Sequence, residues 1–310
     1  MRNSFFMDSS NQQKQTREFF ETFAEQWSRN AKSNHADFVN IIKIRNNYVE
    51  EACKKYLQKN ARTLDVGCGT GDLVISLNKI GYDSSGIDFT FSMIEQAKKD
   101  AKTAEIDTNK FTHISFFDYK PKSKFNLISA NGFIEYISEK QFEEFIANSY
   151  DYLEKGGIFV FESRNRIFNC FSFNTYTEAE IQLNEINNLL EECIIFNNAK
   201  DVNQILSSNF QPKITKNLEK HELTGDKYAH ITVDVRYQYT PFQIIRILEK
   251  NGFSVLDLSP VHIHAITTGA KQKSPEVHTQ LSYHLLEQKN LHLQLIPQSS
   301  SIMITARKNE

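Results

Sequence analysis

The sequence has few cysteines and no basic excess, and each shortage excludes a class of protein. Only four of the 310 residues are cysteine, and they form no CxxC or Cys/His ligand spacing. This scarcity argues against a zinc site and for a reducing compartment. Because the formal net charge is −2, nothing favours binding to a polyphosphate backbone, and nucleic acid is not an expected partner.

Long apolar segments are missing as well. No run of about 20 apolar residues occurs, and the opening residues, MRNSFFMDSSNQQKQ, lack the apolar segment of a secretory signal. We therefore expect a soluble, cytoplasmic protein without a membrane partner. With 40% hydrophobic residues, a chain of this length buries a sizeable core without disulfide or metal. The sequence carries no signal for a particular oligomeric state.

Strand-like segments alternate with helical patterns from residue 63 onward, which predicts a parallel sheet with helices on both faces. Capping boxes indicate helix starts at Ser92 and Ser138, and Thr240 followed by Pro241 indicates another. A further helix is expected over 72–79. The expected strands cover 63–66, 84–88, 112–116, 125–129, 158–162, 253–258 and 301–307.

Three regions depart from this alternation. Two amphipathic helical patterns come first and predict an N-terminal helical lid over 1–60. Segments 164–239, with one helix expected over 178–195, and 260–299 are too long for ordinary connections. The predicted organisation is a lid (1–60), a nucleotide-binding core (61–163), an inserted substrate-side segment (164–239), and the rest of the core (240–310) with a long loop at 260–299.

The segment LDVGCGTGDL, residues 64–73, places a glycine-rich turn between a strand and a helix. Such glycines let a ligand approach the backbone. A dinucleotide fingerprint needs GxGxxG, but here the third glycine comes one residue early, and Asp72 would face a pyrophosphate. No GKS or GKT follows, as a P-loop requires. Asp65 beside the turn suits a positively charged ligand such as S-adenosylmethionine.

LDVGCGTGDL resembles the first motif of class I S-adenosylmethionine-dependent methyltransferases, and three further stretches match that family in order. They are GIDFTFSMIEQAKK, FFDY and SANGFIEYI. The resemblance covers 61–162 strongly and 240–258 with 301–307 more loosely. It implies a Rossmann-like, seven-stranded, mostly parallel sheet whose last strand is antiparallel.

The resemblance also implies S-adenosylmethionine as cofactor and assigns roles to individual residues. Asp88, at the end of the second strand, would hold both ribose hydroxyls. Asp118 would accept from the adenine amino group, with Phe117 beside the ring. Cys68 fills a position in the turn that needs a small residue, and no redox role is expected for it. The predicted cofactor-binding residues are Asp65, Gly67, Cys68, Gly69, Gly71, Asp88, Phe89, Met93, Phe117, Asp118, Ala130 and Asn131.

Candidates for catalysis and acceptor binding come from segments expected at the same sheet edge. His262 and His264 would share one face of an extended chain and are candidate bases for an acceptor hydroxyl. Solvent-facing or satisfied histidines are the simpler interpretation, and a metal would need a third ligand that the sequence does not identify, so no metal site is predicted. Tyr136 is a third catalytic candidate. Trp27, Arg164 and Arg166 are the candidate substrate-binding residues.

The sequence thus predicts a methyltransferase that acts by in-line displacement on an oxygen or nitrogen of a small-molecule or sugar-linked acceptor. A general base is optional in such a reaction, because alignment supplies much of the rate. Two alternatives stay open. One is an NAD-dependent oxidoreductase, and the other is a protein of the same fold that binds S-adenosylmethionine without catalysis.

Overall fold

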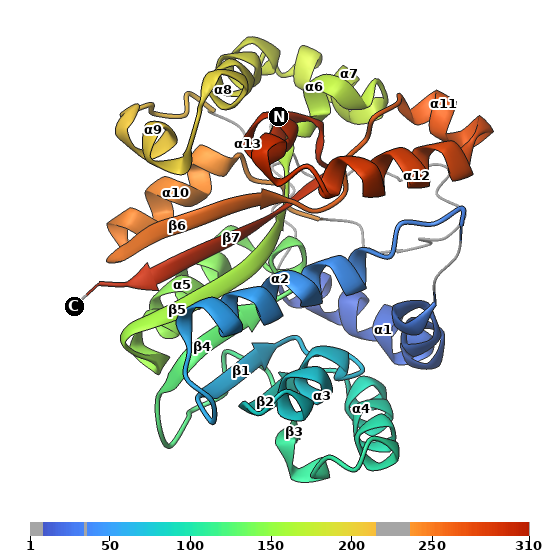
Figure 1. Ribbon diagram of the computed structural model, residues 1–310, viewed down its shortest axis with the longest axis vertical. Helices are drawn as coiled ribbons and strands as arrows, with labels where there is room; N and C mark the ends of the chain where they lie inside the picture. Colours follow the sequence, from blue (N-terminus) through green and yellow to red (C-terminus); the bar gives the residue numbers. More distant parts are fainter. Residues whose placement is uncertain (1–8, 34–35, 215–235, 310) are drawn as a thin grey trace, which may run out of the picture.

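A computed structural model describes residues 9–33, 36–214 and 236–309. Its strands form one seven-stranded sheet in the order β3-β2-β1-β4-β5-β7-β6 (Figure 1). Every neighbouring pair is parallel except those of β7, which runs antiparallel to β5 and β6. The predicted α/β, Rossmann-like sheet is therefore confirmed. The strands are β1 (Arg62–Val66), β2 (Asp83–Asp88), β3 (Phe111–His113), β4 (Phe125–Ala130), β5 (Leu153–Arg164), β6 (Phe253–Pro260) and β7 (Ser301–Lys308).

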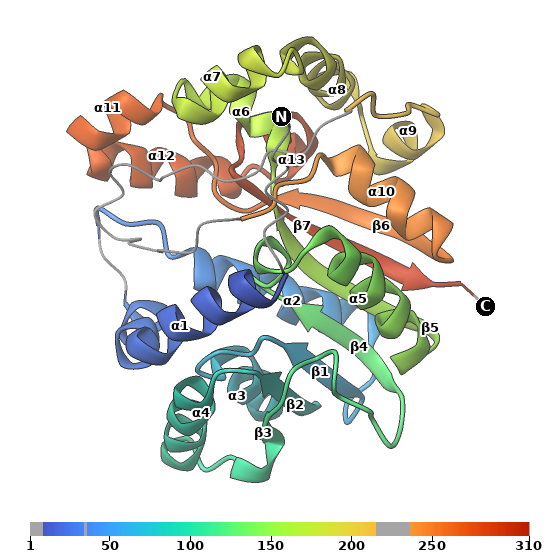
Figure 2. The same cartoon turned by 180° about the vertical axis from the view of Figure 1, so that it is seen from behind.

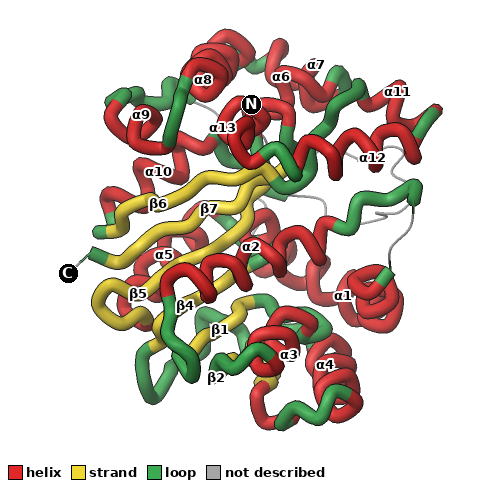
Figure 3. Tube along the Cα trace, in the orientation of Figure 1, coloured by secondary structure: helices red, strands yellow, loops and turns green. Residues whose placement is uncertain are grey.

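Helices cover both faces of the sheet, with α2 and α3 on one side and α5 and α10 on the other (Figures 1 and 2). Figure 3 shows the strands as a central layer between them. The helices are α1 (Ser9–Lys32), α2 (Ile41–Tyr56), α3 (Asp72–Lys79), α4 (Phe91–Thr103), α5 (Glu139–Tyr152), α6 (Asn169–Ser172), α7 (Thr175–Gln182), α8 (Ile186–Asn198), α9 (Val202–Ser207), α10 (Pro241–Lys250), α11 (Thr268–Lys273), α12 (Pro275–Leu286) and α13 (His292–Leu295).

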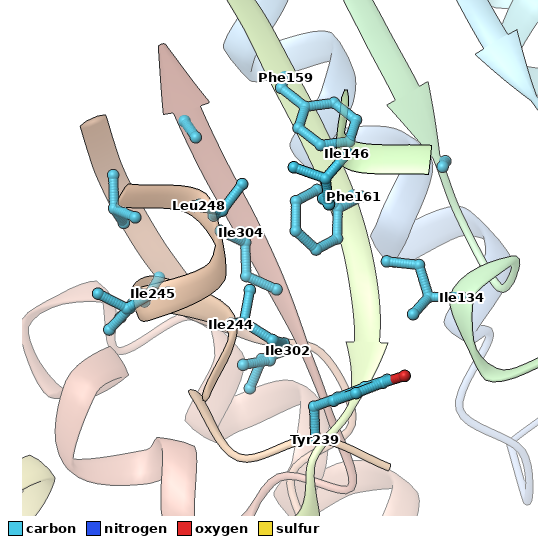
Figure 4. Packing of buried hydrophobic residues seen from close by; sticks show 14 of the residues in the cluster. Ile134, Ile146, Phe159, Phe161, Tyr239, Ile244, Ile245, Leu248, Ile302 and Ile304 are labelled. Carbon is cyan, nitrogen blue, oxygen red and sulfur yellow. The ribbon is translucent and has the colours of Figure 1, made fainter. Parts of the chain in front are cut away.

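The two faces of the sheet follow from the two-residue period of its strands. On β5, Phe159 and Phe161 pack in the cluster that includes α5 and α10, as Figure 4 shows. Their neighbours Ile158 and Val160 pack in a second cluster with residues of α2 and α3. The sheet is therefore packed on both faces, and its edges carry the connecting loops.

Two predicted helix starts are confirmed. Ser138 forms a capping box with Gln141 at α5, and Thr240 caps α10 with Pro241 in its first turn. The predicted Ser92 capping box is wrong. The N-cap of helix α4 lies two residues earlier, at Thr90, and has no side-chain cap. The amides of Phe91 and Ser92 instead donate to the Glu21 carboxylate of α1, each at 2.9 Å.

Three further expectations need correction. The helix expected over 178–195 is interrupted, because Asn184 adopts a left-handed backbone conformation (φ 58°) between α7 and α8. The third strand ends at His113, before the predicted 116. The 260–299 segment, expected as a loop, contains α11, α12 and α13. Within the inserted segment, residues 215–235 lie outside the described residues, as do residues 1–8 and 34–35 of the predicted lid.

Among the described residues, no helix is both long and apolar enough to cross a membrane.

Candidate functional site

A pocket lies where β1, β2, β3 and β4 end, along the carboxyl edge of the parallel strands. In open α/β sheets this edge, near the point where strand order reverses, is where ligands bind. Here the order reverses between β1 and β4. The loops after these four strands form one wall of the pocket, and residues of α1 and α2 line it from the other side.

The glycine turn forms the floor of the pocket. Gly67, Gly69 and Gly71 all have positive φ values, of 68°, 50° and 79°. Gly67 and Gly69 line the pocket, whereas Gly71 does not. A Cβ atom on Gly71 would lie 2.5 Å from the ring of Phe111. The first two glycines therefore leave room at the pocket, and the third permits close packing of the turn against β3.

Two buried carboxylates, Asp65 and Asp88, line the pocket, and neither forms an ion pair with a described residue. Asp88 accepts from the Gly69 amide at 3.0 Å and from the Thr90 amide at 2.8 Å. Asp65 accepts from the Ser129 hydroxyl at 2.7 Å. Burial raises the pKa of Asp88, and burial, with Asp88 nearby, raises the pKa of Asp65 to about 7. A cationic ligand would stabilise the two buried carboxylates in their charged form, and an anionic ligand would destabilise them further.

Helix α1 covers the pocket with one of its faces. Gln13, Thr16, Phe20 and Trp27 line the pocket, at spacings that bring them onto one side of a helix. The helix is fastened to α4 at two places. Glu21 accepts from the first amides of α4, and Asp100 of α4 accepts from Ser28 and Lys32, both at 2.8 Å. The sequence indicated Trp27 but gave no sign of Gln13 or Thr16.

Helix α2 and strand β5 fix the loop after β4. Arg45 of α2 pairs with Glu162 of β5 at 2.8 Å, and the same carboxylate accepts from the Gly132 amide at 3.0 Å. Asn46, one residue after Arg45, also lines the pocket, as do Asn131 and Gly132. The pocket wall after β4 is therefore held by contacts between three elements that are far apart in sequence.

The structure brings most predicted site residues together but not all of them. The pocket lining includes Trp27, Asp65, Gly67, Cys68, Gly69, Asp88, Phe89, Met93, Phe117, Asn131 and Tyr136. Ala130 is buried inside β4. Asp118 is exposed and lies outside the lining. Arg164, Arg166, His262 and His264 are also outside it.

The two candidate arginines after β5 have different surroundings. Arg166 is fully buried and forms a bidentate pair with Glu180, at 2.9 and 2.8 Å. We therefore correct its expected role: it joins the loop after β5 to α7 and presents no free charge to an acceptor. Arg164 contacts Glu135 at 3.4 Å. Arg236, which the sequence did not suggest, approaches the same carboxylate at 3.6 Å.

These two guanidinium groups share one carboxylate next to the pocket, because Glu135 precedes the pocket residue Tyr136. Arg236 also hydrogen-bonds to Tyr136. Burial alone would lower the pKa of Arg164, but Glu135 together with Tyr176, Tyr136 and Glu162 outweighs burial and raises it. Burial, reinforced by Glu135, raises the pKa of Tyr136. The Tyr136 phenol therefore stays protonated and is a hydrogen-bonding group rather than a base.

His262 and His264 follow β6 and meet a third histidine, His278 of α12. The Nε2 atoms of His262 and His278 are 3.0 Å apart. Candidate ligand atoms of all three rings lie within 4.8 Å of one another. Sequence reasoning missed His278, because thirteen residues, which include helix α11 and the start of α12, separate it from His264.

A seven-stranded sheet with an antiparallel last strand, a glycine turn and an acid at the end of β2 defines the class I S-adenosylmethionine-dependent methyltransferases. Comparison with known sequences agrees, since the methyltransferase domain family matches residues 57–252. The chain belongs to this family. It is therefore an enzyme whose methyl donor is S-adenosylmethionine.

Individual relatives are distant. A protein of Geobacillus sp. (strain WCH70) named as a methyltransferase is 24% identical over 68% of this chain and 82% of its own length. The ubiquinone biosynthesis O-methyltransferase of Pelagibacter ubique is 30% identical over 54% of this chain and 70% of its own. Magnesium protoporphyrin IX methyltransferase from Synechocystis PCC 6803, solved with bound SAM, shares the fold at 13% identity, with a TM-score of 0.55 over 99% of this chain and 100% of that one.

Proposed function

We propose that this methyltransferase acts on an oxygen or nitrogen atom of a small-molecule or sugar-linked acceptor that carries an anionic group. The observation that carries the proposal is the arginine pair, Arg164 and Arg236, which shares the single carboxylate of Glu135 beside Tyr136. One positive charge is left over at this place. The Nε of Arg164 also has no hydrogen-bond partner among the described residues. A carboxylate or phosphate is the group that an arginine cluster binds best.

The cofactor arrangement that we propose uses the residues lining the pocket. Asp88 would hold the ribose hydroxyls, and Asp65 would lie by the ammonium group of the donor. Phe117 would lie along the adenine. Asp118 is exposed, so it would reach the adenine amino group only from the rim of the pocket. This placement supports the proposal because both buried acids then face positive charge or hydroxyl donors.

The chemistry that we propose depends on alignment and on exclusion of water. Methyl transfer from a sulfonium is an in-line displacement, for which good alignment is worth an effective molarity of about 10⁵ M or more. Phe20 and Trp27 of α1 cover the pocket with apolar surface. Tyr136 stays protonated, and His262 and His264 lie outside the pocket lining, so the acceptor would supply its own lone pair. The named activity of the Pelagibacter relative supports oxygen as the acceptor atom.

Labelled methyl transfer tests the proposal. The enzyme would be incubated with S-adenosylmethionine labelled in its methyl group and with separate pools of small molecules, nucleic acid and protein. We expect label in small molecules that an anion-exchange resin retains. Arg164→Gln should reduce this transfer, whereas Arg62→Gln, which removes the same charge near the opposite edge of the sheet, should not. Label found only in nucleic acid or protein would contradict the proposal.

A further inference from the structure

Three histidines from two separate segments converge beyond the end of β6. His262 and His264 lie two residues apart after this strand, and His278 comes from α12. The ring centroids are 4.2 Å apart for His262 and His264 and 4.9 Å apart for His264 and His278. All three side chains offer nitrogen atoms within 4.8 Å of one another. Such convergence of imidazoles is the arrangement that binds a transition-metal ion.

The hydrogen bonds of these rings are incomplete. His262 and His278 face each other at 3.0 Å through their Nε2 atoms, which accounts for one nitrogen of each. Both ring nitrogens of His264 and the Nδ1 of His278 are buried without a partner among the described residues. Buried polar atoms in folded proteins nearly always have a partner. A bound ion would give the His264 ring one.

The backbone that carries these ligands is fixed by its own contacts. The amide of His262 donates to the Ser299 hydroxyl at 3.1 Å, and the amide of His264 donates to the Gln298 carbonyl at 2.8 Å. The Ser282 hydroxyl of α12 donates to the carbonyl of Ile263, between the two histidines. The last contact links the segment after β6, which carries His262 and His264, to the helix that carries His278. Ligands held in this way are positioned before an ion arrives.

Two cationic side chains, Lys271 and Arg164, lie near the histidine rings. The nearby cations Lys271 and Arg164 would favour an anionic oxygen as the ion's further ligand.

We propose that His262, His264 and His278 bind one divalent transition-metal ion of the zinc type. Three imidazoles without a carboxylate or thiolate suit zinc, cobalt, nickel or copper and disfavour magnesium and calcium. Zinc–nitrogen distances of about 2.0–2.1 Å place tetrahedral ligands about 3.3 Å apart, so the rings need to move by only about 1–1.5 Å. Three protein ligands leave a fourth position for water or for an oxygen atom of the acceptor.

The position of the cluster connects it with the acceptor side. Strand β7 separates β6 from β5 and runs antiparallel to both, so β6 ends at the same edge of the sheet as β4 and β5. Three strand spacings separate β6 from β4, which is about 14 Å. The ion would therefore lie at the acceptor end of the binding edge, away from the glycine turn.

Metal titration of the untagged, full-length protein tests the proposal. After removal of metals with a chelator, Co²⁺ would be added and followed by its visible absorption, and Zn²⁺ binding would be measured by calorimetry. We expect one equivalent of either ion, displacement of Co²⁺ by Zn²⁺, and no comparable binding of Mg²⁺. His264→Ala should weaken Zn²⁺ binding at least about 100-fold, which exceeds the usual effect of an outer-shell change. His278→Ala should do the same.

His284→Ala is the matched control, because His284 lies on the same helix as His278, is exposed, and is outside the cluster. Its Zn²⁺ affinity should equal that of the wild type. If His278→Ala fails to fold, His264→Ala decides the question, since its ring forms no hydrogen bond that folding needs. Binding of S-adenosylhomocysteine would verify that this variant is folded. Absence of stoichiometric Zn²⁺ binding by the wild type, or equal affinity in His264→Ala, would overturn the proposal.

Discussion

The two ends of the binding edge differ in charge and in how the sequence builds them. At the β1–β2 end, Asp65 and Asp88 lie within 24 residues of each other and flank a local glycine turn. At the β5–β6 end, the charged groups are Arg164 and Arg236, and the histidine cluster lies beyond them; all of these residues come from distant segments. We call the two ends the donor end and the acceptor end after the functions proposed for them. The donor end is acidic and local in sequence, and the acceptor end is basic and assembled by tertiary contacts.

This difference suggests a division of labour. In the arrangement that we propose, a short motif supplies the acids near the cationic donor. The proposed acceptor site instead depends on the long connections after β5 and β6. Variants at the two ends should therefore fail in different ways, and the following predictions run from the largest effect to the smallest.

The largest effect should come from the acceptor end and should concern stability. Glu180→Ala leaves the fully buried Arg166 without its carboxylate. Breaking a buried pair on one side costs about 3–5 kcal/mol of unfolding free energy. Denaturant unfolding would measure this loss. Glu178→Ala, which replaces an exposed residue of the same helix, should change the free energy of unfolding by no more than about 0.5 kcal/mol. Equal losses for the two variants would show that the Arg166 pair is dispensable.

At the donor end, Gly71→Ala should destabilise the protein through packing. The residue has a φ of 79°, and its new Cβ would lie 2.5 Å from Phe111. Backbone strain and the clash together should cost about 2–4 kcal/mol. Gly156→Ala has a similar φ of 69° but no atom within 4 Å of the new Cβ, so it should cost only about 1–2 kcal/mol. Thermal unfolding of both variants separates strain from packing, and identical shifts would contradict the packing role.

Asp88→Asn should weaken binding of S-adenosylmethionine without altering the contacts of Arg164 and Arg236 at the acceptor end. Replacement of a hydrogen-bonded carboxylate should cost about 1–3 kcal/mol of binding free energy. Asp83→Asn, at the other end of β2 beside Lys110, is the control and should bind S-adenosylmethionine normally. Calorimetry of both variants measures the difference. Unchanged affinity in Asp88→Asn would mean that the ribose is held elsewhere.

The affinity for S-adenosylmethionine should depend on pH through Asp65. Its pKa is raised to about 7 in the ligand-free protein by burial, so the carboxyl is protonated below pH 7 and charged above it. If it faces the donor ammonium, the affinity should fall by about fivefold, or ~1 kcal/mol, between pH 7 and pH 6. Asp65→Asn should abolish this dependence. A pH profile identical in the two proteins would exclude Asp65 from recognition of the donor charge.

The smallest effect should come from the contact between α1 and α4. Glu21→Gln removes the negative charge at the α4 N-terminus and leaves an acceptor oxygen for only one of the amides of Phe91 and Ser92. Such a charge is worth about 0.3–1 kcal/mol. Donor dissociation, measured by stopped flow, should become a few-fold faster as α1 opens more readily. Glu25→Gln, exposed on the same helix, should leave the rate unchanged, and a slower release in Glu21→Gln would contradict the covering role of α1.

The sequence predicted the parts of the structure that depend on near neighbours. The glycine turn and the Ser138 and Thr240 caps all have signals within a few residues or within one motif, whereas the antiparallel last strand was expected from the family resemblance. The errors have non-local causes. Ser92 does not form its expected capping box, and the first amides of α4 donate instead to Glu21, which lies about 70 residues earlier.

The acceptor end shows the same limit. Arg236 and His278 belong to no motif, and only the folded chain brings them to Glu135 and to His262. Arg166 looked like a free loop arginine because its partner, Glu180, lies on a helix of uncertain boundary in the sequence. Pairing of buried charges depends on tertiary geometry, and the hydrophobic periodicity of the sequence gives no information about it.

The central claim is that the acid-lined pocket recognises a cationic donor rather than a dinucleotide. Calorimetric titration of the wild-type protein with S-adenosylmethionine, S-adenosylhomocysteine and NAD tests it most directly. We predict saturable, one-to-one binding of the first two compounds and no measurable binding of NAD. Saturable binding of NAD, with none of S-adenosylmethionine, would contradict the account.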